Sequence, residues 1–125
     1  MARQNKQAEE EHQKLEAKDI EVHDPGDYLQ RGWFYYSQGD SSHAILDFRE
    51  AAAGMPDDAE ALYALGMALK AASQNEEASA QFQRAIDLAP QLSDLAKGQI
   101  VGHLARMQLN FLTHGAETPA KEGNA

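Results

Sequence analysis

The chain has 125 residues, 42% of them apolar, no cysteine, and a formal net charge of −9 at pH 7. This length predicts a single domain with a modest core, and the absence of cysteine excludes disulfides, thiolate metal sites and thiol catalysis. The excess of acidic residues argues against sequence-independent binding of nucleic acid, which depends on phosphate neutralisation by lysine and arginine, and against anionic membrane surfaces.

Residues 1–23 form a polar arm rich in glutamine, glutamate and lysine. An isolated helix of this composition is marginal in water, so we expect the arm to be helical or frayed. Leu15, Ile20 and Val22 would allow it to dock on a neighbour instead. The arm lacks the apolar centre of a secretory signal, and no stretch approaches the ~20 apolar residues that a membrane span needs. A cytoplasmic protein without membrane insertion is the simplest expectation.

Start and stop signals divide the next part of the chain into four helices. Asp24, Asp57 and either Asp40 or Ser41 are the expected caps of the first three, and Asn75 begins the fourth. Glycine or proline follows most of these segments, where a helix ends. The expected helices cover about 25–38, 41–53, 58–72 and 75–88.

A fifth helix is expected from Ser93, its cap, to about Thr113, and residues 115–125 are expected to form a flexible tail. The apolar residues of this fifth helix form two adjacent stripes. One consists of Ile100, Leu104, Met107 and Phe111, and the other of Val101, Ala105 and Leu112, with Leu109 at its edge. Packing on the preceding helices requires one stripe. We expect Val101, Leu109 or Leu112 to dock on another protein or a second copy, unless the chain absorbs both stripes.

Residues 25–90 contain two copies of one repeat unit. The members of each equivalent pair lie 34 residues apart: Tyr28 and Leu62, Gly32 and Gly66, Tyr35 and Leu69, Ala44 and Ala78, Phe48 and Phe82, Ala51 and Ala85, Pro56 and Pro90. A fixed period of this size predicts stacked repeats. Gly32 and Gly66 lie mid-helix, where glycine costs roughly 1 kcal/mol relative to alanine. We therefore expect the paired helix, carrying Ala44 or Ala78, to approach closely there.

This pattern resembles the tetratricopeptide repeat family. The resemblance implies an all-α fold, a short helical solenoid of two helix-turn-helix repeats and a fifth capping helix. The domain would cover residues 24–114, with repeats at 25–58 and 59–92 and the capping helix at 93–114. Arg31 departs from the pattern, because the family prefers an apolar residue there; Leu65 in the second unit fits.

The resemblance also implies a concave groove lined by the first helix of each unit. The groove residues would be Leu29, Trp33, Tyr36 and Ser37 in the first unit, and Tyr63, Met67, Lys70 and Ala71 in the second. Tryptophan and tyrosine dominate binding interfaces, and methionine adapts to different ligands. The alternative for Trp33 and Tyr36 is burial within the chain. Lys70 alone does not reproduce the clamp by which some family members hold a peptide carboxylate.

The sequence carries no pattern that indicates catalysis. No two of the five histidines have the spacing of a helical metal site, and there is no glycine-rich phosphate loop. We therefore expect no catalytic residue, no metal and no cofactor. The expected function is non-catalytic binding of a peptide or an amphipathic helix. One alternative is a structural subunit or homodimer that docks through the fifth helix. Another is a small cytoplasmic chaperone of secreted proteins, by analogy of size, charge and repeat number.

Overall fold

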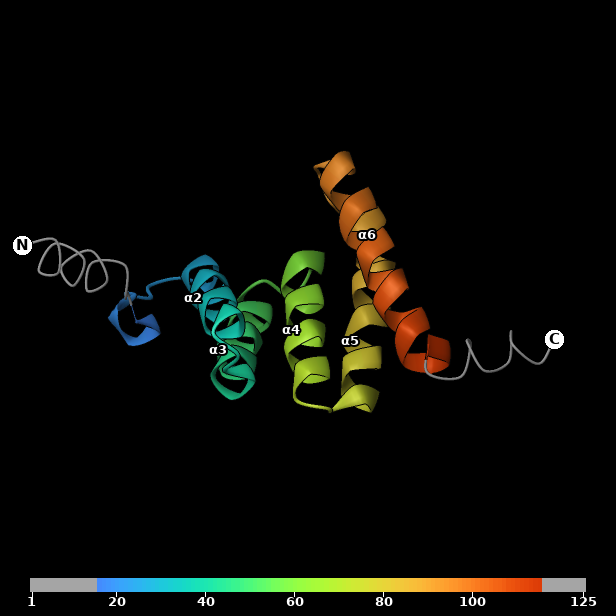
Figure 1. The fold of residues 1–125 in the computed structure, drawn as a ribbon. Helices are drawn as coiled ribbons and strands as arrows, with labels where there is room; N and C mark the ends of the chain where they lie inside the picture. Colours follow the sequence, from blue (N-terminus) through green and yellow to red (C-terminus); the bar gives the residue numbers. More distant parts are fainter. Residues whose placement is uncertain (1–15, 116–125) are drawn as a thin grey trace, which may run out of the picture.

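The computed structural model describes residues 16–115, which form a row of paired helices (Figure 1). The first pair consists of α2 (Pro25–Ser37) and α3 (Ser41–Gly54), and the second of α4 (Ala59–Ala71) and α5 (Asn75–Leu88). The described residues contain no strand. The all-α class and the helical repeat architecture expected from the sequence are confirmed.

A single long helix, α6 (Leu95–Asn110), packs on α5 beyond the second pair. It continues into a π-helical turn, η3 (Phe111–Gly115), and follows a short 3-10 turn, η2 (Ala89–Gln91). At the other end of the row, the 3-10 turn η1 (Ala17–Asp19) contacts α2 and buries Ala17. The expectations of a frayed arm at residues 1–15 and a flexible tail at 116–125 lie outside the described residues.

Carboxylate caps start four of the five long helices. Their side chains accept a hydrogen bond from a backbone amide of the first turn, at 2.9 to 3.1 Å. The caps are Asp24, Asp40, Asp58 and Asp94. The expected caps Asp57 and Ser93 were therefore wrong by one residue each. Asp57 lies inside the turn closed by the amide of Asp58 and the carbonyl of Met55, 3.0 Å apart. At the start of α6, the carboxylate of Asp94 is a stronger acceptor for the positive end of the helix than the hydroxyl of Ser93.

The turn inside each pair has the same backbone conformation. Gly39 has φ of 79° and Ser73, 34 residues further on, has φ of 63°. In each turn the following amide donates across the helix end, from Asp40 to the carbonyl of Tyr35 at 3.0 Å and from Gln74 to that of Leu69 at 2.8 Å. This bond closes a Schellman motif, which satisfies the last carbonyls of a helix. The repeat period therefore extends to the helix ends.

The two mid-helix glycines mark the closest approach within each pair. A Cβ placed on Gly32 would lie 2.5 Å from the ring of Phe48, and one on Gly66 would lie 2.6 Å from the ring of Phe82. Both phenylalanines are fully buried. The close approach expected from the sequence is confirmed, although a phenylalanine ring, rather than Ala44 or Ala78, lies against each glycine.

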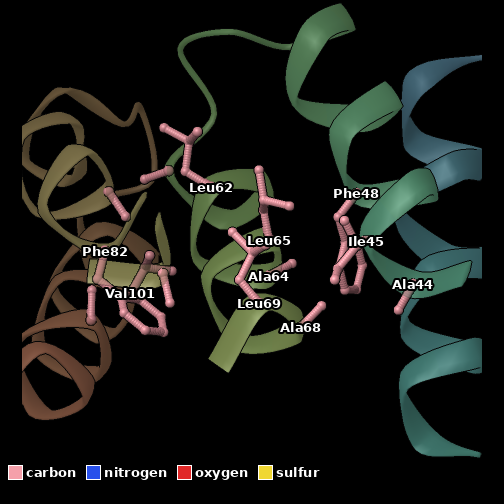
Figure 2. Close-up of a cluster of buried hydrophobic side chains, with 14 of the residues drawn as sticks. Ala44, Ile45, Phe48, Leu62, Ala64, Leu65, Ala68, Leu69, Phe82 and Val101 are labelled. Atoms are coloured by element: carbon pink, nitrogen blue, oxygen red, sulfur yellow. The ribbon is translucent and has the colours of Figure 1, made fainter. Parts of the chain in front are cut away.

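The buried apolar cluster extends from α3 across α4 to α5 and α6 (Figure 2). Phe48, Leu62, Leu69 and Phe82 are its largest fully buried side chains. Helix α4 lies between the first pair and α5, and most of its side chains are buried. Neither pair encloses this core alone, so the pairs stabilise each other by stacking.

Arg31, the departure from the repeat pattern, forms a two-point ion pair with Asp47 on α3. Its Nε and Nη2 donate to the two carboxylate oxygens, each at 2.8 Å. This hydrogen bonding raises the pKa of Arg31. The equivalent positions of the second unit, 34 residues on, hold Leu65 and Gln81. The first unit therefore has an ion pair between its two helices where the second unit has an apolar and an uncharged polar residue.

Candidate functional site

Four half-buried side chains from α2 and α4 form a surface that we call the inner face. They are Trp33, Tyr36, Tyr63 and Met67. The rings of Trp33 and Tyr36 meet edge to face, with centroids 5.5 Å apart. Helices α2 and α4 contact each other, and the pKa of Tyr63 is raised by burial and, to a smaller extent, by Tyr36. The structure thus brings these four predicted site residues together on two neighbouring helices.

Trp33 has two roles in this arrangement. One edge of the indole packs against Phe48, with ring centroids 5.0 Å apart, and Phe48 is fully buried. Trp33 as a whole is half-buried, so part of the residue stays open to solvent. The two sequence interpretations, burial and an open binding anchor, therefore each describe part of this side chain. Loss of the indole would affect stability as well as any ligand.

Leu29 and Ser37 flank the inner face on α2. Leu29 packs partly against the core. Ser37 is exposed at the end of the helix, and its hydroxyl donates to the carbonyl of Phe34 at 2.7 Å. Leu29 therefore mainly supports the face, and Ser37 lies at its rim with its hydroxyl already engaged.

Lys70 lies where α4 meets α6. Its Nζ donates to Oε1 of Gln108 at 2.6 Å and lies 4.3 Å from the ring centroid of Phe111. At the other end of the same two helices, Nζ of Lys97 lies 2.6 Å from Oε1 of Glu60, and this contact raises the pKa of Lys97. The first turn of α4 contacts the first turn of α6, and the last turns of the two helices also contact each other. The two helices therefore run in the same direction. Helix α6 thus lies beside α4, as α4 lies beside α2.

The structure corrects the expected orientation of the fifth helix. Val101 is 7% exposed and Ala105 is fully buried, and Leu109 and Leu112 pack partly against the core. The solvent-facing stripe is the other one: Ile100 is 60%, Met107 53% and Phe111 56% exposed. Val101 is therefore too buried to dock on another protein, whereas docking through the half-buried Leu109 or Leu112 stays a prediction.

Two glycines explain why α6 turns this way. Gly98 and Gly102 lie on the same side of the helix as Val101 and Ala105, and all four are buried. A Cβ on Gly98 would collide with the carbonyl oxygen of Ala89, and one on Gly102 would lie 3.2 Å from the Cβ of Ala89. Because only this side is flat enough to approach the turn after α5, it packs inward. The i, i+4 spacing of the two glycines is the sequence signal for this packing.

The site offers apolar side chains for contact with a ligand and, at one edge, the positive charge of Lys70. Within residues 16–115, no three His, Asp or Glu side chains are grouped as they would be around a metal ion. None of the described helices combines the length and the apolar character needed to cross a membrane.

The second helix pair matches a known family. Residues 59–92 match the sequence model of the tetratricopeptide repeat. This unit is similar to a tetratricopeptide repeat. The match begins at the first residue of α4 and ends just beyond η2, and it includes Tyr63, Met67 and Lys70. A search of curated proteins and a search of solved structures found no match.

The first pair repeats the features of this tetratricopeptide unit. Its signature residues lie 34 positions before their equivalents in the second pair. Both pairs have a contact between a glycine and a phenylalanine ring and a left-handed residue in the turn. The resemblance inferred from the sequence is confirmed by the match and by the helical repeat fold.

Proposed function

We propose that this chain is a non-catalytic protein-interaction module that binds a peptide or an amphipathic helix across the inner face. Tetratricopeptide repeats suggest a role in protein–protein interaction. The observation that carries the proposal is the half-buried cluster of Trp33, Tyr36, Tyr63 and Met67 on two stacked units. A row of aromatic side chains that is neither covered nor fully solvated is the composition of a binding hot spot.

The packing of the inner face also lowers the cost of binding. Edge contacts to Tyr36 and Phe48 hold the indole of Trp33 in place before a ligand arrives. A side chain that is already ordered loses little further rotamer freedom in a complex, where immobilisation otherwise costs roughly 0.5–1.5 kcal/mol per side chain. Covering the open apolar surface adds about 25 cal/mol per Å².

A structural or assembly subunit is the second candidate, since α6 exposes large apolar side chains at the end of the described row. In that case the chain would associate through α6, and the inner face would contribute little.

Met67→Glu provides the first test of the proposal. We expect capture of the native protein partner from cell extract to fall at least tenfold, because a charge placed among the aromatic side chains must be desolvated on binding. Leu46→Glu is the matched control: Leu46 is 61% exposed on α3, outside the inner face. Circular dichroism melts of both variants would verify the fold.

The emission of Trp33 provides the readout in the wild type, because it is the one tryptophan of the sequence. A partner that covers the inner face should shift the emission to the blue. The proposal fails if Met67→Glu and Leu46→Glu retain the partner equally and the emission does not move at saturation.

A further inference from the structure

We propose that α6 docks a helix of the partner protein that carries an apolar face flanked by acidic side chains. The docking surface is the α6 stripe, consisting of Ile100, Leu104, Met107 and Phe111. This inference rests on the proposed function and names the class of partner that α6 would bind.

The geometry of the α6 stripe suits a helix. Its members follow one another at spacings of four, three and four residues, so they lie on one side of α6. Three are more than half exposed, and Leu104 is half-buried at the edge. An apolar stripe of this spacing on one helix can pack against the apolar face of a second helix. Within the described residues, α6 presents apolar side chains that no other element covers.

The charge around the α6 stripe differs from that of the rest of the chain. Asp and Glu together number 20 in the sequence, against 11 Lys and Arg, yet residues 95–115 contain none of these acids. The same segment carries His103, His114 and Lys97, whose charge is paired with Glu60 of α4, and Arg106, which lines the hollow beside Ala89. On an otherwise anionic protein, α6 is therefore a neutral to cationic surface, which complements an acidic partner.

Lys70 supplies a specific point of recognition beside the α6 stripe. Four of the described cations contact a carboxylate: Lys18, Arg31, Arg49 and Lys97. The ammonium of Lys70 instead contacts the neutral amide of Gln108 and the ring of Phe111. An ammonium has three donors, so it can also bind a carboxylate of the partner at the Phe111 end of the stripe.

Charge also decides against a second copy as the occupant. Pairing α6 with itself would place two acid-free, basic segments in contact, within a complex of two chains that each carry a net charge of −9. Like charges facing each other oppose association, whereas an acidic flank on the incoming helix would be attracted.

The test uses two synthetic helical peptides with the same apolar residues at i, i+4, i+7 and i+11. One carries Glu at the flanking positions and the other Lys, and each is titrated calorimetrically into the full chain. The Glu peptide should bind at least tenfold more tightly than the Lys peptide, and added salt should reduce this preference. Ile100→Glu or Met107→Glu should weaken its binding at least tenfold.

Two pairs of variants control for general effects. Leu95 is 71% exposed on α6 but lines the hollow beside Ala89 and Pro90, so Leu95→Glu should leave the affinity unchanged. Lys70→Met should reduce the preference for the Glu peptide, whereas Arg84→Met, an exposed change on α5, should not.

Several results would overturn this inference. These are equal binding of the two peptides, no binding of either, or a wild-type dimer in light scattering that Met107→Glu converts to monomer. The last result would identify a second copy as the occupant. If the native partner depends on Met67 but not on Met107, this inference fails and the proposed function stands.

Discussion

Gly66→Leu is expected to destabilise the protein by about 3 kcal/mol, the upper end of the range for overpacked cores. A first side-chain carbon at this position would already lie 2.6 Å from the ring of Phe82. That ring is fully buried in the second pair and has no solvent-facing side to move toward. Leucine adds three further carbon atoms, so α4 and α5 must separate. Urea unfolding of both proteins would measure the loss.

Ala71→Leu is the matched control for this change, because Ala71 is exposed near the end of the same helix. It should alter the free energy of unfolding by less than about 0.5 kcal/mol. An unchanged midpoint for Gly66→Leu would contradict the close contact between Gly66 and Phe82.

Arg31→Leu should also reduce stability by about 3 kcal/mol, although it restores the apolar residue typical of the repeat. The change leaves the carboxylate of Asp47 unpaired, and the side chain of Asp47 is only 6% exposed. Removal of one partner of a buried ion pair costs roughly 3–5 kcal/mol, and the partial exposure of Arg31 places the value at the low end. Thermal or urea unfolding would measure it.

A double variant separates the ion pair from the packing. Arg31→Leu with Asp47→Gln copies the Leu65 and Gln81 arrangement of the second unit. It should recover most of the lost stability, because the uncompensated charge is gone. If the double variant is no more stable than Arg31→Leu alone, the buried charge is not the cause of the loss.

The parts of the structure that depend on local pattern could be predicted from the sequence. Capping carboxylates, turn glycines and the pairing of Gly32 with Gly66 together indicate two helix pairs. The repeat then places Trp33, Tyr36, Tyr63 and Met67 on the first helix of each pair. Each of these inferences depends only on spacing along a helix or on the repeat period. None of them requires knowledge of contacts between residues far apart in the sequence.

The contacts that depend on packing between helices could not be predicted in this way. Two apolar stripes on α6 compete for the core, and the steric fit of Gly98 and Gly102 against Ala89 decides between them. The ion pair of Arg31 joins residues 16 positions apart, and the contact of Lys70 with Gln108 joins residues 38 apart. Neither separation belongs to a helical period or to the repeat, so both require the packed structure.

The most direct test of the proposed binding surface is a methyl spectrum of the protein labelled at methionine, recorded during titration with the captured partner. Met67 lies on the inner face, Met107 on the α6 stripe, and Met55 in the turn between the helix pairs. We expect the Met67 signal to shift and saturate with the binding curve, while the Met55 signal stays in place. Saturated binding that leaves Met67 unchanged or shifts only Met55 would contradict the inner face as the binding site.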